Sequence, residues 1–217
     1  MKISVQGEQR VKVAPERAEL YLAASGEHTD RAKVIADVTA TANQLGRELE
    51  ELKQAGAVER YTVQPLRTWA VRKGRSRVEQ ITATVELTAD FADFEALGRF
   101  TSDVSGRDGV RLAWVRWRLT DATADRLRDE CIAGAVERAR QRAEAMARAA
   151  GAGTIEIVEI ADPGLLGNPE PQVPLARPMM ARGAMASPMA DESESVQIVP
   201  QEIEIGAQLQ LRFDTVD

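Results

Sequence analysis

Two kinds of hydrophobic pattern follow each other along the chain, and both predict regular structure. Apolar residues recur every three or four positions in the stretches 29–56, 90–106 and 121–151, which predicts three helices. In the stretches between them apolar and polar residues alternate one by one, which predicts strands. Hairpin-like pairs of strands outnumber strand-helix repeats. We therefore expect an α+β fold, a mostly antiparallel or mixed β-sheet with about three helices packed on it.

The longest predicted helix, 121–151, has a buried stripe that is mostly alanine. The stripe residues recur at spacings of three or four and are Leu127, Cys131, Ala135, Ala139, Ala143, Met146 and Ala150. Small side chains let a helix backbone lie close to neighbouring strands, so we expect close docking on the sheet. Asp121 is the expected N-cap of this helix, and Gly151 stands where a left-handed C-cap is expected.

The other two helices carry their own start and stop signals. Thr29 or Asp30 is expected to cap the first helix, and Gly56 to end it. Asp90 is expected to cap the second helix, with Asp93 at its third position.

The strand patterns predict which strands pair and which side chains share a face of the sheet. The strands around 3–13 and 20–24 are interpreted as a β-hairpin, with residues 14–16 as its turn. In the strand 110–119, the alternation places Leu112 and Trp114 on one face together with two arginines, and Trp117 on the other face. The last strand, 203–213, has the cleanest alternation in the chain.

Residues 163–195 break every pattern. Six of the nine prolines and four of the six methionines lie in this segment, which cannot build a core of its own. We expect a Pro/Met/Ala-rich loop or arm inserted before the last strand of a single domain spanning 1–217. The arm is a candidate contact for a protein partner or a neighbouring subunit, since an ordered arm of this length must be held by contacts.

Composition narrows the class of protein. The chain has 217 residues, of which 44% are hydrophobic and 29% charged, and a net charge of −6, so nothing in the overall charge favours nucleic acid or an anionic membrane. No apolar run approaches the roughly 18 to 20 residues that a membrane span needs, and no signal-peptide core follows Met1. We expect a cytoplasmic protein as written, or a periplasmic or secreted one if a signal has been removed. A single cysteine excludes an internal disulfide.

Three stretches of the sequence resemble one known family. Ile3-Ser-Val-Gln-Gly7-Glu followed by Val13-Ala-Pro15-Glu-Arg-Ala18 is similar to the opening of SIMPL-domain proteins, in which a strand ending in Gly-Glu precedes Pro-Asp-x-Ala. The helix end from Arg140 to Gly151 and the closing strand from Pro200 to Phe213 also resemble the family's motifs. The chain departs from the family pattern at Glu16-Arg17, usually Asp-Thr, and at Gln201, usually glycine.

The resemblance implies a binding protein rather than an enzyme. The family has no established activity, cofactor or catalytic residues. Its members include periplasmic and outer-membrane proteins linked to oxidative-stress tolerance, an immunogenic bacterial antigen that forms a ring-like oligomer, and a mammalian adaptor of a pelle-like kinase. We therefore expect a non-enzymatic scaffold protein, homo-oligomeric, with a link to stress tolerance.

Residue chemistry adds two hypotheses about sites. Nucleophilic catalysis and zinc binding are disfavoured, because His28 is the single histidine and Cys131 the single cysteine, on a buried stripe. Soft thioethers suit Cu(I) and scavenge oxidants, and four of them cluster in the arm. The candidate metal ligands are Met179, Met180, Met185 and Met189. The alternative is a linker whose methionines touch a partner.

The second hypothesis concerns a basic hairpin tip with an aromatic residue, Trp69, beside it. The candidate partner-binding residues are Arg72, Lys73, Arg75 and Arg77. Such a tip would suit a nucleic-acid backbone, but it is more often a solvated end that prevents edge-to-edge aggregation. An enzyme with an unrecognised carboxylate site stays open as an alternative, because 34 acidic residues are present.

Overall fold

The computed structural model describes residues 1–73, 77–166 and 199–216, without the side chains of 71–73 and 77–79. The described residues form the three predicted helices with strands before, between and after them, and the stretch after Gly56 forms two short strands. The predicted α+β class with three helices is confirmed for these residues. The single domain predicted for 1–217, with its insert at 163–195, stays a prediction, because 167–198 lie outside the described residues.

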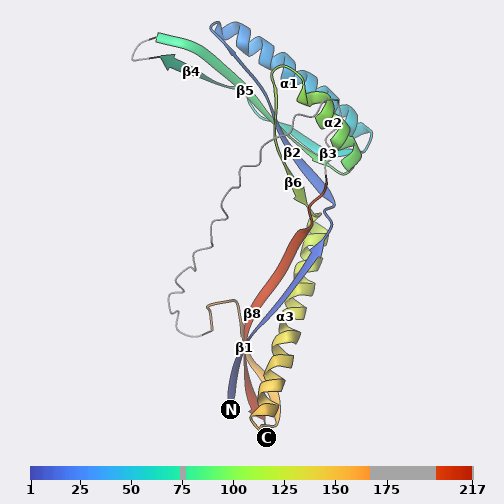
Figure 1. The fold of residues 1–217 in the computed structure, drawn as a ribbon, viewed down its shortest axis with the longest axis vertical. Coiled ribbons are helices and arrows are strands. Elements are labelled where there is room, and N and C mark those ends of the chain that lie inside the picture. The colour runs from blue at the N-terminus through green and yellow to red at the C-terminus, as the bar shows by residue number, and fades with distance from the viewer. Residues whose placement is uncertain (74–76, 167–198, 217) are drawn as a thin grey trace, which may run out of the picture. The chain divides into compact units, whose positions relative to one another are not determined.

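The strands form two sheets in two compact units, one with a single helix and the other with two (Figure 1). One unit has the strand order β1-β8-β7 and contains β1 (Lys2–Val13), α3 (Asp121–Ala149), β7 (Thr154–Ala161) and β8 (Ile203–Val216). The other unit has the order β3-β5-β2-β6, with β4 also paired to β5. It contains β2 (Arg17–His28), α1 (Arg31–Gln54), β3 (Val58–Val63), β4 (Arg67–Lys73), β5 (Arg77–Phe91), α2 (Phe94–Ser105) and β6 (Val110–Arg118).

The predicted hairpin of the first two strands is wrong. β1 belongs to the three-stranded sheet beside β8, whereas β2 pairs antiparallel with both β5 and β6. Residues 14–16 therefore connect two sheets, and Pro15 among them is buried. Alternation in two consecutive stretches indicates strands but does not say which strands pair.

Helices α1 and α2 begin at aspartates. Asp30 caps α1, as expected, because its Oδ1 accepts hydrogen bonds from Ala32 N at 2.8 Å and Lys33 N at 3.4 Å. Asp93, not Asp90, caps α2 and accepts from the backbone N of the residues two and three positions on. Asp90 lies inside β5, because Ala89 and Phe91 continue the strand's alternation into the core.

The small-residue stripe of α3 docks closely on the three-stranded sheet. The buried residues recur every four positions and are Leu127, Cys131, Ala135, Ala139, Ala143 and Ala147. Met146 is half-exposed and Ala150 is exposed, so the predicted stripe is wrong in its last turn. A Cβ on Gly7 of β1 would overlap the carbonyl oxygen of Ala135, which confirms the predicted close approach.

A β-bulge in β6 puts one side chain on a different face from the one that strict alternation predicts. Tyr21 pairs with Trp114, but the next residue of β2 pairs with Leu112, so Ala113 is the extra residue. Leu112 therefore packs against the core together with Trp117, although strict alternation predicts that it shares a face with Trp114. The predicted opposition of Trp114 and Trp117 is confirmed, because Trp117 lies edge-on to Phe94 of α2 while Trp114 is exposed.

Candidate functional site

The five-stranded sheet has two different faces. Helices α1 and α2 cover one face, where alternate residues of β5 such as Ala83, Leu87 and Phe91 are buried (Figure 1). The residues between them on β5 point to the opposite side, which we call the outer face. Along β5 they are Thr82, Thr84, Glu86, Thr88 and Asp90.

Strand register places the outer-face side chains of four strands in two straight rows. In the first row Asp90 of β5 is paired with Arg60 of β3 and Glu19 of β2, and Glu19 with Arg116 of β6. The row therefore reads Arg, Asp, Glu, Arg across the sheet.

The second row lies beside the first and is polar at one end and aromatic at the other. Thr88 of β5 is paired with Thr62 of β3 and Tyr21 of β2, and Tyr21 with Trp114 of β6. The hydroxyls of Thr62 and Thr88 lie 2.6 Å apart and share a hydrogen bond.

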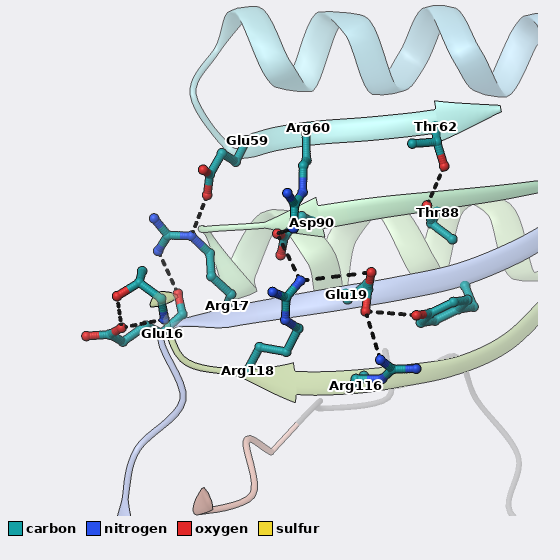
Figure 2. A network of polar contacts seen from close by, with 12 residues as sticks. Glu16, Arg17, Glu19, Glu59, Arg60, Thr62, Thr88, Asp90, Arg116 and Arg118 are labelled. Atoms are coloured by element: carbon teal, nitrogen blue, oxygen red, sulfur yellow. Dashed lines mark hydrogen bonds and ion pairs between the residues drawn. The ribbon is translucent and has the colours of Figure 1, made fainter. Parts of the chain in front are cut away.

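The two carboxylates of the first row lie beside guanidinium groups, as Figure 2 shows. The Asp90 side chain is only 7% exposed, and its Oδ2 lies 3.4 Å from Arg60 Nη2 and 3.6 Å from Arg118 Nη1. Arg118 Nη1 is also 4.0 Å from Glu19 Oε1, and Arg116 Nη1 is 3.7 Å from Glu19 Oε2. Asp90 Oδ1 is buried and has no hydrogen-bond partner among the described residues.

Tyr21 joins the charged row to the aromatic one. Its hydroxyl donates a hydrogen bond to Glu19 Oε2 at 2.8 Å, and this bond, followed by burial and by the charge of Glu19, raises the pKa of Tyr21. The Tyr21 ring stacks on Trp114 with 4.8 Å between centroids, and the Arg116 guanidinium lies 5.3 Å from the Tyr21 ring centre. Trp114 is 58% exposed, so the stack reaches solvent beside β6.

A second set of polar contacts lies at the end of the sheet where β2 begins (Figure 2). Arg17 Nε donates to Glu59 Oε2 at 2.9 Å, which lowers the pKa of Glu59. Glu16 Oε2 accepts hydrogen bonds from the backbone N and the hydroxyl of Thr120, at 2.8 and 2.7 Å. The contact joins the residue just before β2 to the residue just before α3.

His28 and Cys131, the residues weighed for nucleophilic catalysis, both make contacts that belong to the fold. His28 Nδ1 accepts a hydrogen bond from Asp30 N at the start of α1. Cys131 is buried in the α3 stripe, with its Sγ 3.6 Å from the carbonyl oxygen of Ile205. In the described ranges no group of three or more His, Cys, Asp or Glu side chains could hold a metal ion.

Both site hypotheses drawn from the sequence fall on residues without described side chains. The four methionines, Met179, Met180, Met185 and Met189, lie outside the described residues, as does Arg75. Backbone pairing of β4 with β5 places Arg72 opposite Val78 and Lys73 opposite Arg77. The copper and basic-tip hypotheses therefore stay predictions.

The structure brings together residues that sequence reasoning missed. Alternation in 110–119 puts Trp114, Arg116 and Arg118 on one face, and this part of the signal is correct. No motif or pattern in the sequence distinguishes Glu19, Tyr21 and Arg60 from other surface residues. Their importance comes from strand pairing between stretches that lie tens of residues apart, which one sequence does not reveal.

The chemistry of this surface suits binding. Two adjacent carboxylates are also the arrangement that acid-base catalysis uses. Here arginines flank both carboxylates and make them parts of an ion-pair network. Around this network lie exposed arginine and aromatic groups, which are the side chains that dominate protein interfaces.

The chain matches a known protein family over nearly its whole length. The sequence model of the SIMPL family, described as a protein of unknown function (DUF541), matches residues 3–213. No curated protein matches the chain. Among the described helices none is long and apolar enough to cross a membrane.

Proposed function

Because this chain belongs to the SIMPL family, whose function is unknown, we propose a function from its surface: a non-enzymatic scaffold protein that binds further copies of itself. The observation that carries the proposal is the exposed stack of Trp114 on Tyr21 at β6, with Arg116 beside it. Tryptophan, tyrosine and arginine are the residue types that contribute most of the binding energy in protein interfaces.

The charge of the outer face supports a second copy as the partner. The network at the end of the sheet contains four arginines, Arg17, Arg60, Arg116 and Arg118, and four carboxylates, Glu16, Glu19, Glu59 and Asp90 (Figure 2). A polyanion such as nucleic acid would meet as many negative as positive groups here. A protein surface of mixed charge is a better match, and the chain itself offers one.

The test is the mass of the assembly. We expect light scattering on the full chain at micromolar concentration to give a multiple of the 23.7 kDa chain mass. Trp114→Ala should weaken association by about tenfold or more, as truncation of a central interface tryptophan does. Trp69→Ala is the matched control, because Trp69 is 51% exposed but lies on β4, away from the stack.

Two outcomes would contradict the proposal. One is a wild-type mass of 23.7 kDa across the concentration range. The other is equal association of the wild type, Trp114→Ala and Trp69→Ala, which would move the interface elsewhere.

We also propose a role in stress tolerance, which the family resemblance alone supports. Removing the gene should lower survival of the host under peroxide, and expression of the wild-type chain should restore it. If the mutant survives as well as its parent, this part of the proposal is lost while self-association is unaffected.

A further inference from the structure

The two sheets end in strands of opposite charge. β6 is the last strand of the five-stranded sheet, and its residues Val110–Arg118 include Arg111, Arg116 and Arg118 but no acid. β7 is the last strand of the three-stranded sheet, and its residues Thr154–Ala161 include Glu156 and Glu159 but no base. In the described parts of the chain each of these strands pairs with one neighbour only, β6 with β2 and β7 with β8.

On both edge strands the charged side chains lie on the side of the sheet away from the helices, and apolar side chains lie on the helix side. On β6 the arginines and Trp114 lie on the side away from α1 and α2, whereas Val115 and Trp117 pack on the helix side and are only half-buried. On β7 Glu156 points away from α3, while its neighbours on the helix side are likewise half-buried. These neighbours are Ile155 and Ile157.

We infer that β6 of one copy pairs with β7 of a second copy, edge to edge, and that this pairing is the contact that covers Trp114. This inference rests on the proposed self-association and names the surfaces that make it. The backbone groups on the edges of β6 and β7 that no described strand pairs with supply the hydrogen bonds, as in strand addition. Arginines then face glutamates on one side of the joined sheet, and two half-buried apolar rows meet on the other.

Glu156 gives independent support from its own sheet. It is paired with Asp214 of β8, so two acids stand directly opposite each other, an arrangement that destabilises a sheet. Among residues 1–73, 77–166 and 199–216 no ion pair is described for either side chain, and the neighbouring Arg212 binds Glu159 instead, with 2.6 Å between Nη1 and Oε2. An arginine from a neighbouring β6 would neutralise this pair.

The competing interpretation is that charges and bulges protect the edges. Both strands contain a bulge, at Ala113 in β6 and at Val158 in β7, and bulges and charges are common devices against aggregation. Protection alone does not require the two edges to carry opposite signs. A charge-reversal experiment separates the two interpretations.

The experiment uses two variants of the full chain, alone and mixed. The β6 variant carries Arg111→Glu with Arg116→Glu, and the β7 variant carries Glu156→Arg with Glu159→Arg. Each alone places like charges on both edges, so we expect its dissociation constant to rise by roughly tenfold or more. In an equimolar mixture, each reversed edge meets an edge of opposite sign, and the wild-type mass should return.

A third variant keeps the test valid if a double variant folds poorly. Glu156→Arg alone places an arginine opposite Asp214, which should preserve the three-stranded sheet while it weakens the assembly. The inference is overturned if Glu156→Arg assembles like the wild type, or if the mixture stays as light as its components. In both cases an oligomeric wild type would leave self-association standing, whereas a monomeric wild type would remove the proposed function itself.

Discussion

Asp90 of β5 and Glu19 of β2 lie directly opposite each other on the outer face of the five-stranded sheet. Like charges in this position destabilise a sheet unless a cation lies between them. Arg118 Nη1 reaches both carboxylates, at 3.6 Å from Asp90 and 4.0 Å from Glu19. The fold therefore depends on a charge from the edge strand β6, the same strand that carries the proposed interface.

Replacing Arg118 tests this dependence. Arg118→Met should lower the free energy of unfolding by roughly 2 kcal/mol or more, because it leaves a largely buried carboxylate pair without its shared cation. Arg116→Met is the matched control. Its side chain is 59% exposed and, among the described residues, its carboxylate partner is Glu19, so we expect a loss below about 1 kcal/mol. Urea denaturation measures both, and equal losses would contradict the bridging role of Arg118.

The hydrogen bond from Tyr21 to Glu19 predicts that the pKa of Tyr21 depends on Glu19. The chain has two tyrosines, so Tyr61→Phe leaves Tyr21 as the single phenol in an absorbance titration. Its pKa should lie above that of free tyrosine, because Glu19 accepts the bond and repels the phenolate. Adding Glu19→Gln should lower this pKa. An unchanged midpoint would show that Glu19 does not hold the hydroxyl.

The sign of the linked pH effect follows from the raised pKa. The contribution of the neutral phenol to stability is present below the pKa of an unfolded tyrosine and is lost as pH rises through the higher pKa of the folded state. The stability difference between the wild type and Tyr21→Phe should therefore shrink at alkaline pH.

The close docking of α3 predicts intolerance of larger side chains on its stripe. Ala139 is fully buried against β1, so Ala139→Leu should cost about 1 to 3 kcal/mol of folding free energy by overpacking. Ala145→Leu is the control on the exposed side of the same helix and should change stability by less than about 0.5 kcal/mol. Thermal melting compares them. Identical melting temperatures would mean that the stripe does not face the sheet.

The sequence predicts helices and strands well because periodicity, alternation and cap residues act over a few positions of the chain. The period of apolar residues places α1 within two residues of its observed ends, and Asp30 and Gly56 mark its limits through cap chemistry. The alternation of β8 is confirmed from Ile203 to Phe213. Each of these patterns depends on residues a few positions apart.

Partner choice between strands is not local, and the errors lie there. β1 joins β8 across most of the chain, so proximity in sequence misleads the hairpin prediction. Asp90 carries the signal of a helix cap but lies inside β5 as the direct pairing partner of Glu19, and Leu112 changes face because of a bulge. The candidate surface is built from such pairings, which explains why its central residues escape sequence reasoning.

Hydrogen exchange of the β6 backbone, measured as a function of protein concentration, tests the central claim most directly. An edge strand that pairs with a second copy gains hydrogen bonds only in the assembly. We expect β6 amides that point away from β2 to be protected at micromolar concentration and to lose protection on dilution or in Trp114→Ala, while amides of β3, at the other edge of the sheet, do not respond. Fast exchange in β6 that is independent of concentration would contradict the claim.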